Sequence, residues 1–357
     1  MKFVHIADMH FDANFSSLNG INGLSEKRRL EQRKIMKKVI EYIKENSIEY
    51  LFIAGDLYEQ EYIRKSSIEY INKLFIDIPE TRIYISPGNH DPLLKNSFYN
   101  TFEWNENVHI FGGEIEKIET EDVDIYGFGF KDYYCKNSEI ENIKIENREK
   151  NNILIVHGSL DGGNDEYREY NPLSNRKLKE LGFDYIALGH IHKKDFNSEP
   201  NQRIVYPGST MALGFDELGE HGMIVGELEN GELKTEFIKL DDREYKEIEV
   251  DVSQDNSTED IVDRIENINI IENNIYKIIL VGNRNFAIDT KEIKKLLSKE
   301  NIVKIKDETR LAYNINEIIL RNDIKGVFVK KVLEKYERGL IDKETMEKVI
   351  ETGLEVL

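Results

Sequence analysis

Residues 51–56 read Leu-Phe-Ile-Ala-Gly-Asp, an apolar run that ends directly in a glycine and a carboxylate. A strand with no polar interruption is typical of a sheet that is covered on both faces. Short apolar runs also stand at residues 3–7, where His5 is the one polar residue, and at residues 83–85, 153–156 and 185–188. Apolar residues at helical spacing separate the first three runs, so we predict an α/β fold with helices packed on a largely buried sheet.

Each of the five runs is followed at once by side chains that can bind a metal ion. They are Asp8, His10, Asp56, Asn89, His157, His190 and His192. In open α/β sheets ligands bind beyond the carboxyl ends of the strands, so all of these side chains can meet at one edge. Imidazole nitrogens mixed with carboxylate and amide oxygens suit manganese, iron, zinc or similar ions. The set is too large for one tetrahedral ion and predicts two ions that share a bridging carboxylate.

Each of these residues also has a simpler interpretation. An aspartate at a strand end is often a cap or turn residue, an Asn-His pair often makes a turn, and a single histidine is often a hydrogen-bonded core residue. Several such groups in order, each at a strand end, favour the metal site over these alternatives. Two adjacent metals acidify a water and clamp the attacking and leaving oxygens at phosphorus, which indicates phosphoester chemistry.

The order of the motifs resembles the calcineurin-like metallophosphoesterase superfamily over about residues 1–240. The motifs are Asp8-x-His10, Gly55-Asp56, Gly88-Asn89-His90-Asp91, His157-Gly158 and Gly189-His190-Ile191-His192. The resemblance implies a metallophosphoesterase β-sandwich flanked by helices. It also implies two ligand sets, which are Asp8, His10 and His192 for one metal and Asn89, His157 and His190 for the other. Asp56 would bridge the two ions, and His90 would protonate the leaving oxygen or stabilise charge in the transition state.

Further stretches are similar to the SbcD-type DNA repair exonuclease subunit, and especially to its YhaO-like bacterial branch. They are residues 184–193, 206–209, 214–217 and 325–329. This resemblance implies manganese as the metal, with magnesium, iron and zinc as alternatives. It also implies DNA as the substrate and an SbcC-like coiled-coil ATPase as the partner. The roughly 115 residues after Asp241 also favour a polymeric substrate, since a small-molecule enzyme of this fold needs little beyond the core.

Glu59 departs from the pattern of the families that the chain resembles. Archaeal and eukaryotic relatives of the nuclease carry a histidine three residues after the bridging aspartate, and phosphoprotein phosphatases carry an aspartate followed by a phosphate-binding arginine. Here the two residues are Glu59 and Gln60, so that arginine is absent. Glu59 is a candidate to orient His90 by a hydrogen bond. The alternative is a glutamate at a helix start that interacts with the helix dipole.

The composition limits the classes of protein to which the chain can belong. A formal net charge of −19 argues against whole-surface binding to nucleic acid, although a local basic patch or bound metal can still bind it. The basic residues within 27–38 are interpreted either as a solvated helix face or as an edge that contacts phosphate. The single cysteine, Cys135, fits a reducing compartment. No apolar run approaches the ~20 residues of a membrane span, and residues 1–7 read as a strand, so we expect a cytoplasmic protein without a membrane partner.

We predict three parts along the chain: a metallophosphoesterase domain at 1–242, a small α+β domain at 243–320 and a helical tail at 321–357. The middle part rests on two strand-like stretches, Ile248–Val252 and Ile275–Val281, around a helical pattern. Two smaller expectations concern the first part. Ser25 is expected to cap the first helix, and Gly162-Gly163 is interpreted as a loop.

The tail is expected to form two amphipathic helices separated by Gly339, the second capped by Asp342. Their apolar stripes are Val329, Val332, Leu333 and Tyr336 in the first helix, and Met346, Val349, Ile350 and Leu357 in the second. Helices of this length are marginal alone in water, so they need a surface to pack on. They either pack on their own domain or dock on a partner coiled coil.

The sequence therefore predicts a two-metal phosphodiesterase acting on DNA, a repair exonuclease subunit. Two alternatives remain open: a small-molecule phosphodiesterase or phosphomonoesterase of the same fold, and a non-catalytic scaffold that binds a partner. The intact ligands at every motif argue against the scaffold. A homodimer is one alternative for the oligomeric state.

Overall fold

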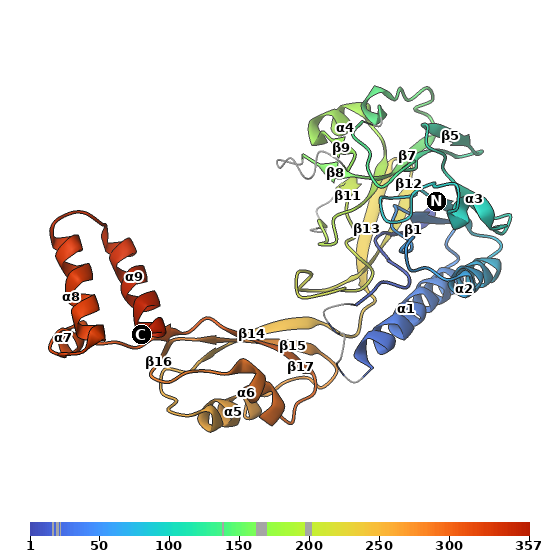
Figure 1. Cartoon of the computed structure of the whole chain (residues 1–357). Coiled ribbons are helices and arrows are strands. Elements are labelled where there is room, and N and C mark those ends of the chain that lie inside the picture. The colour runs from blue at the N-terminus through green and yellow to red at the C-terminus, as the bar shows by residue number, and fades with distance from the viewer. Residues whose placement is uncertain (16–17, 19–20, 22, 138, 162–169, 197–201) are drawn as a thin grey trace. The chain divides into compact units, whose positions relative to one another are not determined.

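The structure is a computed structural model that describes residues 1–357 except 16–17, 19–20, 22, 138, 162–169 and 197–201 (Figure 1). The chain divides into two compact units, Met1–Glu244 and Tyr245–Leu357. The loop interpretation of Gly162-Gly163 lies outside the described residues.

The first unit contains two large sheets. One has the strand order β13-β12-β1-β2-β3-β4 and the other β11-β10-β7-β6-β5. The strands of the first are β1 (Lys2–Ile6), β2 (Tyr50–Ile53), β3 (Arg82–Ile85), β4 (Val108–Ile110), β12 (Gly222–Glu229) and β13 (Glu232–Lys239). Those of the second are β5 (Glu116–Glu119), β6 (Val123–Phe128), β7 (Asn151–His157), β10 (Tyr185–Gly189) and β11 (Ile204–Val205). Strands β1 to β4 are mutually parallel, as are β6, β7, β10 and β11, whereas β5, β12 and β13 pair antiparallel.

The two sheets pack face to face and enclose one hydrophobic core. Phe3 and Phe52 of the first sheet lie in one buried cluster with Ile153 and Tyr185 of the second. The ring centroids of Phe3 and Tyr185 are 4.6 Å apart. The expected β-sandwich is therefore confirmed.

Helices cover the outer faces of both sheets. Helices α1 (Leu24–Asn46) and α2 (Lys65–Ile76) connect β1 to β2 and β2 to β3, and both bury apolar side chains. The alternate strand residues Val4 and Leu51, which lie outside the inter-sheet core, are fully buried as well. On the second sheet, Leu178 of α4 (Asn175–Leu181) belongs to the buried outer cluster. Helices thus cover the outer faces of both sheets, as the apolar strands predicted.

The expected cap of α1 is wrong. The helix begins at Leu24, and the preceding residue, Gly23, has a positive φ of 69° and offers no side-chain cap. The Ser25 hydroxyl instead donates a hydrogen bond to the carbonyl of Phe15. A loop contact made by the fold has taken the place of the local capping bond.

The second unit has a three-stranded parallel sheet in the order β14-β15-β17. The strands are β14 (Tyr245–Asp251), β15 (Ile275–Val281) and β17 (Ile302–Asp307), with helices α5 (Thr258–Glu266) and α6 (Thr290–Leu296). Ile261 and Ile293 of the helices pack with Ile278 of the sheet. The predicted strand–helix–strand order is confirmed, and the sequence interpretation missed α6 and β17.

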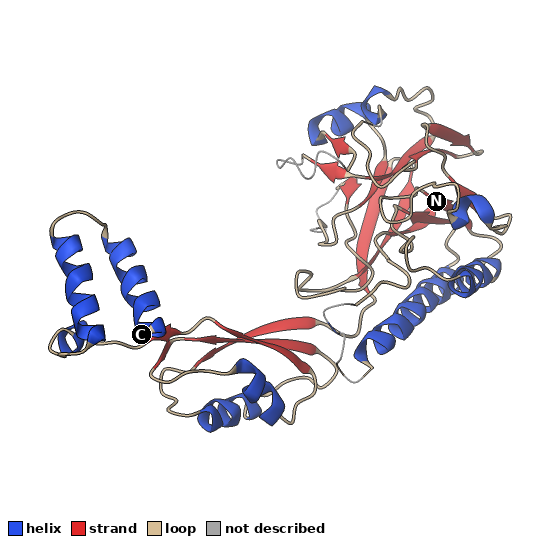
Figure 2. Ribbon diagram, viewed as in Figure 1, coloured by secondary structure: helices blue, strands red, loops and turns tan. Residues whose placement is uncertain are grey.

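The tail forms a helical hairpin of α8 (Ile324–Glu337) and α9 (Lys343–Val356), drawn as the last two helices in Figure 2. Asp342 caps α9 by accepting a hydrogen bond from the Thr345 amide, as expected. Val329 and Val332 pack against Met346 and Ile350. The stripe prediction is partly wrong, because Tyr336, Val349 and Leu357 are exposed. A division of this unit near residue 320 stays a prediction.

Short elements complete the described chain. They are α3 (Phe98–Thr101), η2 (Ile140–Asn142), β8 (Ser159–Leu160), β9 (Pro172–Leu173), β16 (Asn283–Arg284), β18 (Arg310–Leu311) and α7 (Ile315–Ile318). Among the residues that the structure places, none of the helices has both the length and the apolar character needed to cross a bilayer.

His5 is a polar residue inside the sandwich, and it makes stability depend on pH. Its side chain is buried, and Nδ1 lies 2.9 Å from the hydroxyl of Tyr185. Burial lowers the pKa of His5 to about 3, because the interior disfavours the charged imidazole. The unfolded chain therefore binds the extra proton below pH 6.5, and the native state does not.

Stability should fall as the pH falls from 6.5 toward 3. A single histidine with this pKa costs about 2 kcal/mol of unfolding free energy between pH 6.5 and 4.5. The variant His5→Gln, whose side chain stays neutral, should lose about 2 kcal/mol less unfolding free energy than the wild type between pH 6.5 and 4.5. Urea unfolding followed by circular dichroism, with chelator present, measures the difference. An equal loss in both proteins would show that His5 does not cause it.

Candidate metal centre

The ends of five strands from the two sheets meet at one edge of the sandwich. Asp8 and His10 follow β1, Asp56 follows β2 and Asn89 follows β3 in the first sheet; His157 ends β7, and His190 and His192 follow β10 in the second. The amide of His190 donates to the Asp8 carboxylate, 3.0 Å from Oδ1. This bond joins the two sheets directly at the candidate site.

Unusual backbone conformations aim these side chains. Asp8, His10, Asp56 and His190 all have positive φ values, of 51°, 47°, 51° and 103°. Non-glycine residues seldom adopt this region, and sites that do so cluster where function needs them. The fold holds the turns with backbone bonds, since the amide of His10 donates to the carbonyl of Asp56 at 2.9 Å.

A glycine lets the neighbouring chain segments come this close. A Cβ at Gly189 would lie 1.8 Å from the carbonyl oxygen of Ala54. No side chain fits there, so the second sheet can reach the first only with glycine at this position.

Two imidazole nitrogens face each other at the centre of the first ligand set. Nε2 of His10 and Nε2 of His192 are 3.0 Å apart. Their Nδ1 atoms lie 2.7 Å from carboxylate oxygens of Glu59 and Glu217, which fixes Nδ1 as the protonated nitrogen in the neutral rings. If both rings are neutral, two unprotonated nitrogens point at one another, which is unfavourable unless a proton or a metal cation lies between them. Asp8 offers a carboxylate oxygen to the same point, so the set fits a cation.

A second set lies beside the first, with Asp56 between the two. Nε2 of His157 is 2.9 Å from Oδ1 of Asn89 and 3.3 Å from Oδ2 of Asp56. Nδ1 of His157 donates to the carbonyl of Ala54, which leaves Nε2 free to bind metal. Nδ1 of His190 is 3.2 Å from the same Asn89 oxygen. Asp56 Oδ2 also lies 3.8 Å from Nε2 of His10, within reach of the first set.

The carboxylates of the cluster favour a bound positive charge. Burial lowers the pKa of His192, but the hydrogen bond to Glu217 and the charge of Asp8 outweigh it and raise that pKa to about 10. Burial also opposes the charged form of His157, yet Asp56 raises its pKa to about 9. A proton thus takes the position that a metal would fill, so the cluster can bind metal.

Glu59 links the candidate ligand His10 to the partly exposed His90. Its Oε1 lies 2.7 Å from Nδ1 of His10, and its Oε2 lies 2.9 Å from Nδ1 of His90. Burial alone would raise the pKa of Glu59, but these two hydrogen bonds lower it to about 2. The His90 side chain is 45 % exposed. The helix-start alternative for Glu59 is wrong, since α2 begins only at Lys65.

Two supporting residues were missed by the sequence interpretation. Asp91 is fully buried and accepts hydrogen bonds from the amides of Asp56, Leu57 and Gly88 and from the Tyr99 hydroxyl. It therefore fixes the two loops that carry Asp56 and Asn89. Its place at the end of the Gly88–Asp91 motif was the available signal.

The second missed residue is Glu217. One carboxylate oxygen of Glu217 lies against Nδ1 of His192. The other accepts hydrogen bonds from the Ser209 hydroxyl at 3.1 Å and the Leu213 amide at 3.0 Å. These bonds leave the carboxylate one orientation, in which it faces the imidazole. The run Gly214–Glu217 was noted only for its resemblance to relatives, without a role.

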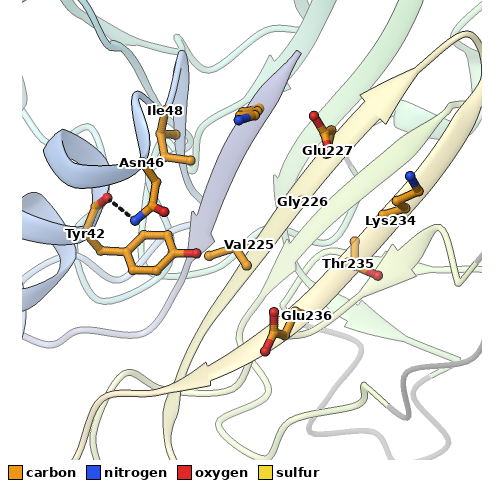
Figure 3. A pocket seen from close by; sticks show the side chains of 10 residues that line it. Tyr42, Asn46, Ile48, Val225, Gly226, Glu227, Lys234, Thr235 and Glu236 are labelled. Carbon is orange, nitrogen blue, oxygen red and sulfur yellow. Dashed lines mark hydrogen bonds between the residues drawn. The ribbon is translucent and has the colours of Figure 1, made fainter.

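A separate hollow lies far from this chemistry. It has a volume of about 300 Å³ and lies between the end of α1 and strands β1, β12 and β13, with Tyr42, Val225 and Lys234 in its lining (Figure 3). Lys2, at the start of β1, also lines it, whereas Asp8 follows the end of that strand. The hollow is therefore at the opposite end of β1 from the candidate metal centre.

Comparison with known proteins identifies the class. The model of the calcineurin-like phosphoesterase family matches residues 1–194, and the chain belongs to this family. Proteins of this family are hydrolases that use two divalent metals.

Two curated relatives are similar to this chain over about 70 % of its length. The chain is 28 % identical over 266 residues to the uncharacterized metallophosphoesterase YhaO of Bacillus subtilis, covering 71 % of this chain and 64 % of that protein. It thus spans less than two thirds of that relative. It is 30 % identical over 287 residues to the SbcD subunit of the nuclease SbcCD from Staphylococcus epidermidis, covering 70 % of this chain and 72 % of that protein.

Glu217→Gln should weaken metal binding without unfolding the protein. The neutral amide cannot balance the charge of a metal-bound His192, and loss of such a partner typically costs 10–100-fold in affinity. Manganese titration of the metal-free protein by calorimetry measures the change. Glu220→Gln is the matched control, because Glu220 is exposed and pairs with Lys194. Equal affinities in the two variants would contradict the role of Glu217.

Proposed function

We propose that this chain is a two-metal phosphodiesterase that acts on DNA as the nuclease subunit of a repair complex. The observation that carries the proposal is that Asp56 lies between two clusters of candidate ligands, one of which brings two imidazole nitrogens to 3.0 Å from each other. The proposed ligands are Asp8, His10 and His192 for one ion, and Asn89, His157 and His190 for the other, with Asp56 shared. Manganese is the proposed metal, because the donors mix imidazole, carboxylate and amide.

The metals and the side chain of His90 have separate roles in the proposed reaction. When bound, the metals would polarise the phosphodiester and acidify a water. His90 is proposed to hold a proton at the mouth of the site and to give it to the leaving oxygen. In the metal-free protein burial opposes its charged form, but the hydrogen bond to Glu59 and the charge of Asp56 raise its pKa to about 9. The hydrogen bond to Glu59 would go on stabilising the protonated imidazole when metals are bound.

Arginines beside the site support a polyanionic substrate. A cavity of about 830 Å³ is lined by Arg29, Arg33 and Arg64 together with Tyr62. The amide of Tyr62 donates to the carbonyl of Glu59, so the cavity adjoins the loop that holds His90. Asp12 and Glu26 also line the cavity and pair with Arg33 and Arg29. Of the three arginines, Arg64 is therefore the one proposed to contact a phosphate.

The basic run 27–38 therefore has no single role. Arg28 is buried, and its guanidinium lies 2.8 Å from the carboxylate of Asp241. Lys38 pairs with Asp242. Arg29 and Arg33 line the arginine cavity, where they pair with Glu26 and Asp12.

The helical hairpin is the proposed docking element for an SbcC-like coiled-coil ATPase. Its inner residues pack on one another, yet a groove of about 540 Å³ is lined by Phe328, Val349 and Gly353. Such a groove fits an amphipathic helix. A relative named as a subunit of the nuclease SbcCD supports this partner. A cytoplasmic location is part of the proposal, since the chain has one cysteine.

His90→Ala should keep both metals and lose turnover by about 10²–10⁴-fold, the usual contribution of a positioned general acid. Asp56→Asn should lose metal as well, because an amide bridges two cations poorly. Elemental analysis after manganese loading and hydrolysis of bis-p-nitrophenyl phosphate and of linear DNA provide both readouts. A His90→Ala protein that loses metal but keeps normal activity per bound ion would refute the assigned role. Robust turnover of p-nitrophenyl phosphate alone would favour the phosphomonoesterase alternative.

Arg64→Gln should weaken DNA binding and leave bis-p-nitrophenyl phosphate turnover unchanged. The loss of one phosphate contact should lower the slope of log K against log salt by about 0.7–0.9. Arg82→Gln is the matched control, because Arg82 starts β3 and so lies at the end of that strand away from the site. Fluorescence anisotropy at several salt concentrations tests the pair. The same slope in all three proteins would exclude the arginine cavity from the DNA path.

A further inference from the structure

A column of aromatic rings runs from the candidate metal centre to the surface. The ring of Tyr170 lies on that of His190, with centroids 5.0 Å apart and planes 33° apart. Tyr134 lies on Tyr170 in turn, with a centroid distance of 5.7 Å and the same 33° between planes. The Tyr134 side chain is 55 % exposed. The column thus begins on a proposed metal ligand and ends in a ring that water can reach.

The fold holds this column in place. Cys135 and Tyr170 form an isolated parallel bridge, and the amide of Asn171 donates to the carbonyl of Cys135. The Asn171 side chain donates to the carbonyl of His157 at 2.8 Å. The segments that carry both tyrosines are therefore tied to the last residue of β7, which itself belongs to the metal cluster.

Core packing does not account for the outer ring. The tyrosines of the sandwich interior, such as Tyr185, are buried in the inter-sheet core, whereas Tyr134 leaves more than half its surface in water. A flat exposed ring beside a phosphodiester site offers a face on which a nucleobase can stack, and stacking tolerates any base because every base has a π-face.

We propose that Tyr134 and Tyr170 form a platform that stacks an unpaired nucleobase next to the phosphate at the metal cluster. This rests on the proposed phosphodiesterase function and narrows its substrate class. Bases inside a duplex are already stacked on their neighbours, so the platform selects single strands and frayed ends. Tyr134 is then a binding residue, and Tyr170 joins it to the His190 ring.

A pair of substrates measures how much base stacking contributes to substrate binding. One is a single-stranded oligonucleotide with a base at the nucleotide adjoining the cleaved bond, and the other has an abasic residue there. The wild-type protein with manganese should show a KM on the order of 10-fold higher for the abasic strand. Tyr134→Ala should raise the KM for the normal strand by about the same factor and show little difference between the two strands. Tyr134→Phe, which keeps the ring, should behave as the wild type.

A binding measurement gives a second readout. A 2-aminopurine at the same position of a phosphorothioate strand should be quenched by the wild-type protein and by Tyr134→Phe, and not by Tyr134→Ala. The manganese affinity of the metal-free protein, measured by calorimetry, should be equal in all three proteins, because the ring of Tyr134 lies on Tyr170 and not on His190.

Several results would overturn the inference. If Tyr134→Ala weakens manganese binding as much as it weakens DNA cleavage, the column only positions His190. An abasic strand that the wild type cleaves as well as the normal one would also exclude stacking. Both outcomes leave metal-dependent hydrolysis standing, whereas a wild-type protein that hydrolyses no phosphodiester with manganese would refute the proposed function itself.

Discussion

The structure depends on holding two buried carboxylates and four imidazoles together at one edge of the sandwich. Asp8 and Asp56 are both shielded from water. Burial and the nearby Asp56 charge raise the pKa of Asp8, whereas His157 lowers the pKa of Asp56 although burial opposes it. Buried charges of this kind persist only when they are paired or coordinate metal. The arrangement is therefore incomplete without cations, and the surrounding fold keeps it from relaxing.

The sandwich core provides the rigidity that this edge requires. The positive φ values at Asp8, His10, Asp56 and His190 are each costly and persist only where the surroundings over-determine them. Packing of the two sheets, with Phe3 on Tyr185, fixes the strands to which these turns belong. Around the ligands, Glu59, Asp91 and Glu217 add hydrogen bonds that leave each imidazole or loop one orientation. Ligand geometry is thus set by residues that need not touch a metal.

The two sides of the site serve different parts of a substrate in our proposal. Arg64 lines the arginine cavity by the loop of Glu59 and offers positive charge for a phosphate. Tyr170 and Tyr134 extend from His190 and offer ring faces for a base. Charge and stacking are the two sequence-tolerant ways of binding a single strand, which suits an enzyme that acts at the backbone.

The sequence by itself determined the five strands that lead to the candidate site, the Asp, Asn and His side chains at their ends and the cap at Asp342. These follow from local patterns: apolar runs, residues at their ends, and a capping side chain three residues before its partner. Tertiary structure decided the rest, because the partners lie far apart along the chain. Arg28 looked like a surface cation and is buried against Asp241, and Ser25 looked like a cap and bonds to Phe15. In β17 the alternation of lysines with apolar residues is itself the pattern of a strand that packs on one face, and the sequence interpretation overlooked it. Glu217 and Tyr134 reach His192 and Tyr170 only through folding, since neither has a local pattern that specifies a hydrogen bond or a contact between rings.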